Sequence, residues 1–325
     1  MGMYHRYISE LIKRLWSYVD TESLADTGFL DRTEPDVRRP PVFRAEFAYR
    51  NVLIAADADE RSKQAIISSL PLSERHQHFA SMRSSQALAQ SVFGNLAILG
   101  KLSLLNGIKT NEGLPAFEMD LDNAQMKLEY NVSHLGEPRP TSVDVWLDGG
   151  HRIAVECKLA EPEFGTCSRP MLRQGVDKNF DRDYCDGNYA RQRGRQSRCS
   201  LSEIGIKYWS FVPEIFDWSA DNDMLPCALR NTYQLIRNVL AACVREDGTI
   251  DLERSYALII FDAANPAYQE DGKAMEQFAT ARSALKNPAM LRSLSWQSLV
   301  SHLESAQSLP DLTAKLRSKY GFPPA

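Results

Sequence analysis

The 325-residue sequence predicts an α/β (α+β) fold, in which a mixed central sheet of about four to five strands is flanked by helices. Three observations support this prediction. Residues 142–159 alternate apolar and polar side chains on both sides of a Gly-Gly turn, which is typical of two antiparallel strands. Residues 256–261 form a short apolar run that is typical of a buried strand. Residues 230–243 show the periodicity of an amphipathic helix.

The N-terminal part of the chain is predicted to be helical. In its first segment, apolar residues recur at helical spacing and would pack on the domain or on a partner: Ile8, Leu11, Ile12, Leu15, Trp16 and Val19. Further helices are expected around residues 43–56, 58–69, 72–80 and 85–104. The last of these would begin at Ser84 or Ser85, because serine is a preferred N-cap residue.

Helical periodicity returns near the C-terminus, over residues 297–304 and 312–319. We therefore expect two parts, a helical N-terminal region over residues 1–84 and a domain with a helical C-terminal addition over residues 85–325.

The hairpin within residues 142–159 carries a group of charges on one side. Side chains of a strand alternate between its faces, so the apolar residues of both strands share one side, which is expected to face the core: Val143, Val145, Leu147, Ile153, Val155, Cys157 and Leu159. The opposite side, expected to be exposed, carries Asp144, Glu156 and Lys158.

The turn of this hairpin decides whether the charges meet. If residues 148–150 form a three-residue loop with a glycine in the left-handed conformation, Ser142 lies opposite Glu156. Asp144 is then the diagonal neighbour of Glu156, about 7–8 Å away. A two-residue loop would instead turn Asp144 toward the core. The apolar pattern therefore favours the odd loop, or a bulge.

An Asp on one strand followed by Glu-x-Lys on the next resembles the motif of the PD-(D/E)xK, or restriction-endonuclease-like, nuclease superfamily. The motif here consists of Asp144 and Glu156-Cys157-Lys158, and residue 143 is Val where the motif's name has Pro. The segments 138–142 and 233–238 also resemble uncharacterised bacterial restriction endonucleases. The resemblance is best between about residues 85 and 266, and it implies that residues 85–325 form a restriction-endonuclease-like domain.

The resemblance implies a Mg²⁺-dependent endonuclease, with Mn²⁺ as an alternative metal, that hydrolyses phosphodiester bonds of DNA and could serve in restriction or defence against foreign DNA. Asp144 and Glu156 would bind the metal, because Mg²⁺ prefers hard oxygen ligands. The resemblance adds the backbone carbonyl of Cys157 as a ligand. Lys158 would hold the attacking water and offset charge on the phosphate. The sequence does not distinguish DNA from RNA as the substrate.

Other residues could complete such a site. Glu129 lies in an alternating stretch that is expected to be the first strand, and it is either a further catalytic acid or a solvent-facing residue. Gln86 and Gln90 lie where related nucleases often place a Glu, but glutamine carries no charge. The resemblance also places the helix over residues 230–243 against the sheet with Gln234 toward the site. The other interpretation of Gln234 is an exposed polar flank.

A long polar stretch, about residues 161–205, follows the hairpin and is predicted to be a basic insertion. Residues 165–199 contain eight basic and four acidic side chains, so this window carries +4 in a chain of net charge −4. It is either a solvated charged loop or a nucleic-acid surface, where basic residues hold phosphates and tyrosines stack on bases. The nucleic-acid contacts would be Arg173, Lys178, Arg182, Arg191, Arg193, Arg195, Arg198, Tyr184 and Tyr189.

Four of the six cysteines fall in or just after this stretch: Cys167, Cys185, Cys199 and Cys227. None forms a Cys-x-x-Cys pair, so the spacing does not favour a cysteine-bound zinc ion or iron–sulfur cluster, although some nucleases of this class carry such clusters. Cys157 and Cys243 lie in apolar patterns and are expected to be small core residues.

Composition limits the class of protein. No run approaches the roughly 20 apolar residues of a membrane helix, and no signal peptide is visible, so we expect a cytoplasmic protein without a membrane partner. Cutting both strands of a palindrome would require two sites, and therefore a homodimer. The alternative function is a non-catalytic nucleic-acid-binding or regulatory protein that keeps the nuclease fold.

Overall fold

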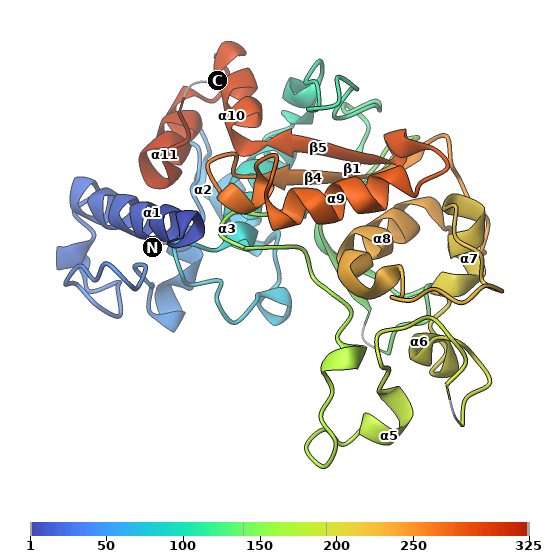
Figure 1. The fold of residues 1–325 in the computed structure, drawn as a ribbon. Helices are drawn as coiled ribbons and strands as arrows, with labels where there is room; N and C mark the ends of the chain where they lie inside the picture. The colour runs from blue at the N-terminus through green and yellow to red at the C-terminus, as the bar shows by residue number, and fades with distance from the viewer. Residues whose placement is uncertain (1, 139, 193, 324–325) are drawn as a thin grey trace.

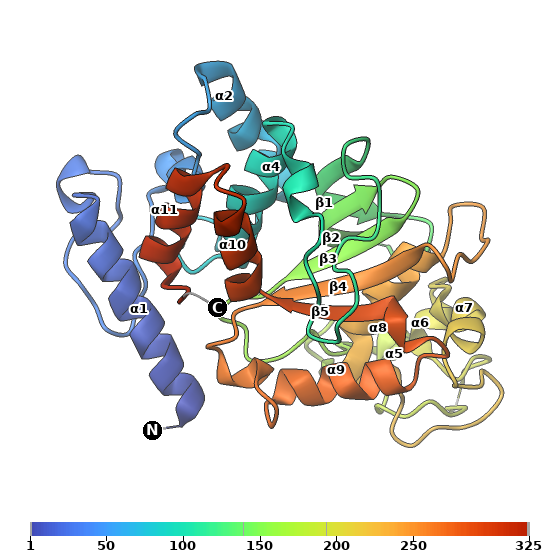
Figure 2. The same cartoon turned by 90° about the horizontal axis from the view of Figure 1, so that it is seen from above.

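A five-stranded mixed sheet, covered by helices on both faces, forms the centre of the molecule (Figure 1 and Figure 2). This computed structural model confirms the predicted α/β class, and it describes residues 2–138, 140–192 and 194–323. Arg193, one of the predicted nucleic-acid contacts, lies outside the described residues.

The strands lie in the sheet in their chain order, as β1 (Gln125–Val132), β2 (Thr141–Asp148), β3 (Arg152–Cys157), β4 (Ser255–Phe261) and β5 (Leu291–Ser295). The pairs β1–β2 and β2–β3 are antiparallel, whereas β3–β4 and β4–β5 are parallel. Parallel neighbours need crossover connections. Helix α8 (Leu229–Cys243) lies in the first crossover and α9 (Lys273–Ser283) in the second, and every residue of β4 is buried.

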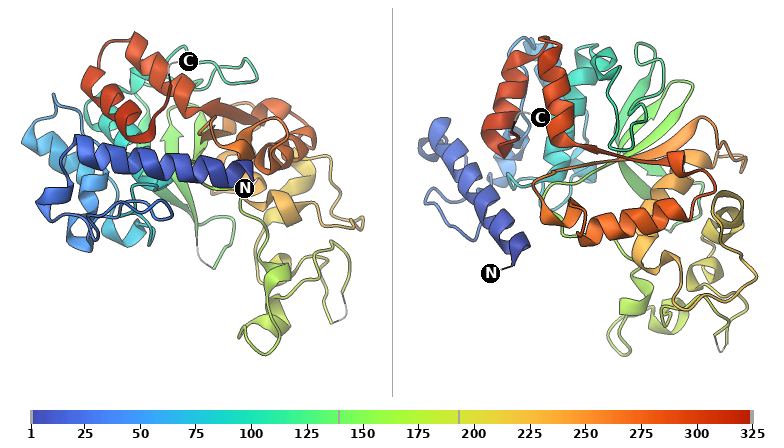
Figure 3. Two further views of the ribbon diagram at one scale, coloured as in Figure 1. Left: turned by 60° about the vertical axis from the view of Figure 1, so that its left-hand side comes forward. Right: turned by 45° about the horizontal axis from the view of Figure 1, so that its top comes forward.

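The opposite face of the sheet is covered by helices from both ends of the chain. Helix α1 (Met3–Thr21) packs against α11 (Pro310–Tyr320), so segments far apart in sequence lie side by side (Figure 3). The other α-helices in the described residues are α2 (Glu60–Ser68), α3 (Ser85–Ala89), α4 (Asn95–Ile98), α5 (Phe180–Asp183), α6 (Ser200–Glu203), α7 (Tyr208–Ile215) and α10 (Trp296–Ser305). Within residues 2–138, 140–192 and 194–323, no helix is long and apolar enough to cross a membrane.

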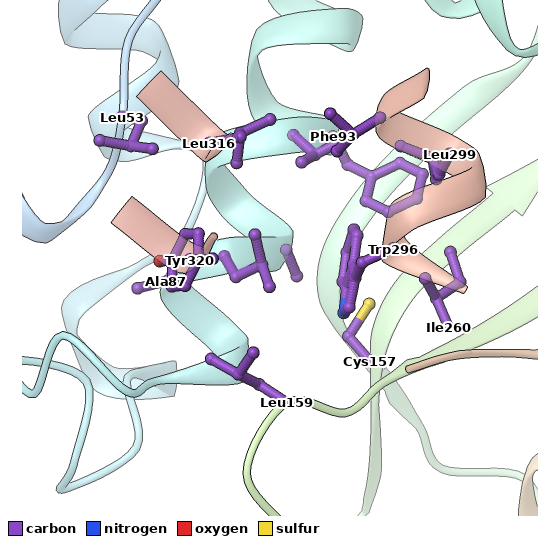
Figure 4. Packing of buried hydrophobic residues seen from close by; sticks show 14 of the residues in the cluster. Leu53, Ala87, Phe93, Cys157, Leu159, Ile260, Trp296, Leu299, Leu316 and Tyr320 are labelled. Atoms are coloured by element: carbon purple, nitrogen blue, oxygen red, sulfur yellow. The ribbon is translucent and has the colours of Figure 1, made fainter. Parts of the chain in front are cut away.

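Two apolar cores result, one on each face of the sheet. In the first, Cys157 and Ile260 from the sheet lie near Trp296 of α10, with Phe93 and Leu299 beyond (Figure 4). The indole N–H of Trp296 donates a hydrogen bond to the carbonyl of Lys158, at 3.0 Å. The second core lies beneath α7, α8 and α9. Because residues from Tyr7 to Phe322 share the first core, the boundary at residue 84 stays a prediction.

Several predicted helices are present, and others are not. The segments now called α1, α2, α10 and α11 are helical, and α3 begins after Ser84, whose side chain accepts a hydrogen bond from the N–H of Ala87. α3 and α4 are joined by a π-helical turn, η4 (Gln90–Gly94). The prediction of α-helices over residues 43–56 and 72–80 was wrong, because only short 3₁₀ turns form there. The buried Asn51 amide instead bonds the carbonyls of Phe79 and Ser81.

The remaining short helical turns in the described residues are η1 (Ala25–Thr27), η2 (Ala45–Asn51), η3 (Leu72–Glu74), η5 (Leu102–Leu105), η6 (Arg169–Met171), η7 (Pro266–Tyr268) and η8 (Pro288–Met290). The segment between β3 and α8, which contains the predicted insertion, has little regular structure. It extends away from the sheet with the short helices α5 and α6 (Figure 1).

Candidate active site

The register of the hairpin brings Asp144 and Glu156 together. Val145 pairs with Val155 and Leu147 with Ile153, so the turn consists of residues 149–151, with Gly150 at φ 91°. The predicted turn started one residue too early, and the prediction that Ser142 lies opposite Glu156 is wrong. Both turns contain three residues, so the charged side chains keep the same face. One step beyond the Val145 pair, Asp144 accepts a hydrogen bond from the N–H of Cys157, at 2.7 Å.

The charged face is buried rather than exposed, which corrects the sequence prediction. Helix α8 packs on β3 and β4, so that Glu156 is only 4% exposed and Lys158 only 8%. The expected sharing of one face by the valines is also wrong at Asp144, since Val145 belongs to the first core and Val143 to the second. Both faces of the hairpin therefore pack against an apolar core, and the charged side chains are buried there.

Glu156 is held at both carboxylate oxygens. Lys158 Nζ lies 2.7 Å from Oε1, and the side-chain amide of Gln234 donates to the same oxygen, also at 2.7 Å. The amide of Asn238 donates to Oε2, at 2.8 Å. Of the two orientations left open for Gln234, the structure has the one toward the sheet. Asn238 was missed, although its position four residues after Gln234 puts it on the same helix face.

The electrostatics of the site depend on a surplus of carboxylates. Burial and the nearby charges of Glu156 and Glu129 raise the pKa of Asp144 well above its usual value. Burial also acts to raise the pKa of Glu156, but Lys158 and other polar neighbours outweigh it, so that this pKa is lowered. Burial acts to lower the pKa of Lys158, but Glu156, Glu161 and Asp144 outweigh it and raise this pKa. Lys158 therefore remains an ammonium paired with an ionised Glu156.

Glu129 lies beside this pair in a distorted part of β1. Its φ is 48°, in the left-handed region that residues other than glycine rarely adopt. Its carboxylate accepts hydrogen bonds from Ser142 and, at 2.7 Å, from the amide of Gln86. Burial raises the pKa of Glu129, and the charge of Glu156 contributes. Gln90 is not part of the site, because its buried amide bonds the carbonyl of Ile66 at 2.8 Å.

Glu161 is a second residue that the sequence analysis missed. It accepts hydrogen bonds from the N–H of Leu159, at 2.7 Å, and from the hydroxyl of Ser85, at 2.8 Å. Its charge helps to raise the pKa of Lys158. The signal in the sequence was its position three residues after the lysine of the motif.

Comparison with protein families matches residues 24–321 to the family described as "Restriction Endonuclease associating with ARP" (REase-ARP). The chain belongs to the REase-ARP family. This confirms the resemblance to restriction endonucleases, and the match includes α2 and the whole sheet, whereas α1 precedes it. No curated protein and no solved structure matches the chain.

The donor atoms of this REase-ARP site fit a hard divalent cation. Asp144 and Glu156 offer carboxylate oxygens, and the backbone carbonyl of Cys157 lies between Glu156 and Lys158 along the chain; the Cys157 side chain is buried in the first core. A cation would relieve the repulsion that, after burial, raises the pKa of Asp144. Among the described residues, however, no group of three or more His, Cys, Asp or Glu side chains could hold a metal ion as it stands.

The predicted nucleic-acid contacts divide into two groups. Arg173, Lys178 and Arg191 are exposed, and Arg173 lies 3.9 Å from the carboxylate of Asp177. Arg182 is exposed but pairs with Asp183 at 2.6 Å, and Arg198 pairs with Asp223 at 2.8 Å. Arg195 is half-buried, and its guanidinium lies 3.4 Å from the Gln192 side-chain oxygen.

The two tyrosines of the insertion already stack on other rings. Tyr184 stacks on Phe180, with 4.6 Å between ring centroids. Tyr189 is 4% exposed, stacks on Trp209 and donates a hydrogen bond to the carbonyl of Ala220. The prediction that Tyr189 stacks on a base is therefore wrong, because both its ring and its hydroxyl are used inside the protein.

Proposed function

We propose that this chain is a divalent-metal-dependent endonuclease that hydrolyses phosphodiester bonds of DNA, in restriction or another defence against foreign DNA. The proposal rests on one observation above all: Asp144, Glu156 and Lys158 meet at the end of β3 with more carboxylates than one lysine can neutralise. A purely structural ion pair would need neither Asp144 nor Glu129 nearby, because each adds repulsion. Membership of a restriction endonuclease family supports the same conclusion.

The chain's own residues would divide the work as follows. Asp144, Glu156 and the carbonyl of Cys157 would hold Mg²⁺, or Mn²⁺ in its place, which when bound would polarise the phosphoryl oxygen. Lys158, kept protonated by its acidic neighbours, would orient the attacking water and offset the charge that develops on the phosphate. Gln234 and Asn238 would position the Glu156 carboxylate. Glu129 would be a further acid at the edge of the site.

Three exposed basic residues of the insertion, Arg173, Lys178 and Arg191, would contact DNA phosphates without reading the base sequence, and Arg173 would leave its contact with Asp177 to do so. Arg182, Arg195, Arg198 and Tyr184 would take part only after giving up the contacts described above. The enzyme would act in the cytoplasm, and as a homodimer where it cuts both strands of a palindrome.

The test is to incubate the purified chain with plasmid, linear and single-stranded DNA, and with RNA, in Mg²⁺, Mn²⁺ or EDTA. We expect cleavage of DNA that requires metal and that is lost in the Asp144→Asn variant. Cleavage of RNA but not of DNA would show that the substrate is RNA. Absence of products under every condition would contradict the proposal.

One observation favours a second function, a nucleic-acid-binding or regulatory protein without catalysis. Both oxygens of Glu156 are bonded to Lys158, Gln234 and Asn238, which is an arrangement that also suits a buried structural ion pair. DNA binding that persists in EDTA, without cleavage in any metal, would support this alternative.

A further inference from the structure

Three cysteines of the insertion and one that follows it surround one small cavity. Cys167, Cys185, Cys199 and Cys227 line a space of about 20 Å³ beside Tyr189 and Leu201. Among the described residues that line it, none is a carboxylate or an imidazole. Cys185 and Cys199 are buried, and all four cysteines are unpaired by disulfides. The cavity therefore presents sulfur as its only strong metal ligand.

The four sulfurs lie close to one another, because each of Cys167, Cys199 and Cys227 interacts electrostatically with at least one other cysteine of the group. Burial raises the pKa of Cys167 to about 11 and that of Cys227 to about 12, and it also raises the pKa of Cys199. Burial therefore favours the neutral thiol at these three cysteines. The sulfur of Cys185 accepts a hydrogen bond from the N–H of Gly187, at 3.3 Å, and donates to the carbonyl of Asn188, at 3.7 Å. A soft metal ion that displaces the thiol protons would bind the sulfurs as thiolates.

We propose that Cys167, Cys185, Cys199 and Cys227 bind a metal centre through four thiolates, as either a zinc ion or an iron–sulfur cluster. Both are soft metal centres that four cysteines hold, and N–H···S bonds tune both. On binding, each thiol releases its proton to solvent and its sulfur electron pair bonds the metal. The described side chains do not yet meet at one point, since no group of three could hold a single ion as it stands. Each sulfur position depends on one side-chain torsion, so rotation about that bond moves it relative to the cavity.

The centre would join the irregular insertion to α8. Cys227 precedes the first turn of α8, whereas Cys167, Cys185 and Cys199 come from loops that have little other regular structure. Gly165 and Gln234 are also bonded to each other through their backbones and through the Gln234 side chain, at 3.0 and 2.8 Å. A metal held here would fix the insertion against the helix that positions Glu156. This role is structural and does not depend on the proposed nuclease activity.

The test begins with the metal content of the full-length chain, purified without oxygen and without chelators. Elemental analysis and the visible absorption spectrum distinguish a zinc ion from an iron–sulfur cluster. Zinc at about one ion per chain with no visible absorption identifies a zinc centre. Iron with acid-labile sulfide and visible absorption identifies an iron–sulfur cluster. Protein isolated without metal is reconstituted in one arm with Zn²⁺ alone, and in the other with Fe²⁺ and sulfide.

Variants then locate the ligands. We expect Cys185→Ser and Cys199→Ser to lose most of the bound metal, whereas Cys243→Ala, a buried cysteine on α8 outside the cavity, retains it. Circular dichroism checks the fold of each variant, and the wild-type measurement stands even if a ligand variant fails to fold. Folded wild-type protein that takes up neither metal centre overturns the proposal. So does metal binding that survives in the Cys185→Ser/Cys199→Ser double variant. Neither result involves DNA, so failure here is distinct from failure of the nuclease proposal.

Discussion

Two buried lysines in this molecule have pKa values that are shifted in opposite directions. Lys158, at the end of β3, lies 2.7 Å from Glu156, and its carboxylate neighbours outweigh burial and raise its pKa. Lys319, on α11, is 1% exposed and donates hydrogen bonds to the carbonyl and side-chain oxygens of Asn51, both at 2.7 Å. Burial lowers the pKa of Lys319 to about 7. Similar burial therefore keeps one lysine charged and makes the other readily neutral.

The difference teaches how to recognise a candidate site. A perturbed lysine alone is weak evidence, because Lys319 is strongly perturbed by packing between α11 and η2. Around Lys158, the informative feature is that the neighbouring carboxylates carry more negative charge than the nearby positive charge can balance. A cation would relieve that surplus at Asp144, whereas Lys319 has only neutral oxygens as its hydrogen-bond partners.

Replacing each lysine by methionine is the strongest test of this comparison. Lys158→Met should lower the rate of DNA cleavage at least about 100-fold, because a positioned charge in an active site commonly contributes that much. Lys319→Met should leave the rate close to that of the wild type. The measurement is initial rates of plasmid cleavage in Mg²⁺, with circular dichroism to check that both variants fold. Equal rates in the two variants would remove the functional distinction.

Asn238 tests how Glu156 is held. Asn238→Ala removes the amide that donates to Glu156 Oε2, so the carboxylate should be less well oriented for a cation. We expect half-maximal cleavage to require about 10–100-fold more Mg²⁺. The matched control is Asn231→Ala, an exposed asparagine on the same helix, which should leave the Mg²⁺ requirement unchanged. A lower rate at every Mg²⁺ concentration with no shift in the requirement would show that Asn238 does not act through the metal.

The hairpin and its charged face could be predicted because strand alternation is a local property of the sequence. The register could not, since either glycine of the Gly-Gly pair is able to take the left-handed position, and the turn formed one residue later than expected. Burial of the site was also hidden, because it depends on where α8 packs. The i, i+4 spacing of Gln234 and Asn238 could have indicated both amides once that packing was assumed.

Strand β5 and the cysteine cavity show what local patterns miss. In β5, the buried Arg292 and Ser293 break the apolar pattern, and they are satisfied by Glu118 and Glu112 from a distant segment. The four cysteines have no motif spacing, because irregular loops rather than a short knuckle bring them together. In both cases the partners are far apart in the sequence, so no local window contains the information.

Asp144→Asn should separate stability from activity at the site of Lys158. Because the pKa of Asp144 is raised in the folded state, ionisation of this residue above its ordinary value of 3.8 costs stability as the pH rises. Asparagine keeps the acceptor for the Cys157 N–H but carries no charge. In EDTA at pH 7, the free energy of unfolding should increase by about 1.4 kcal/mol for each unit of raised pKa that is relieved.

Urea denaturation of the wild type and Asp144→Asn, with and without Mg²⁺, measures this effect. Mg²⁺ should stabilise the wild type more than the variant, and the difference between the two proteins in EDTA should disappear at acid pH. Asp181→Asn, an exposed residue of the insertion, is the control and should change little. Destabilisation by Asp144→Asn in EDTA would mean that no charge surplus exists.

Lys319 provides the smallest and most specific test, through the pH dependence of stability. Folded protein releases this proton near pH 7, whereas the unfolded chain keeps it up to the ordinary pKa of 10.5. Between these values the unfolded state binds more protons, so the free energy of unfolding should rise with pH, by up to about 1.4 kcal/mol per pH unit. Below pH 7 the folded and unfolded states both keep the Lys319 proton, so this residue no longer makes the free energy of unfolding change with pH.

Lys319→Met should remove that slope, while Lys315→Met on the same helix should keep it, because it breaks the ion pair with Asp311 (2.8 Å) but leaves Lys319 in place. Urea denaturation of all three proteins at several pH values between 7 and 10 measures the slopes. Lys158→Met should also leave the slope in place, since the raised pKa of Lys158 keeps its proton bound across this interval. If Lys158→Met rather than Lys319→Met removed the slope, the roles assigned to the two lysines would have to be exchanged.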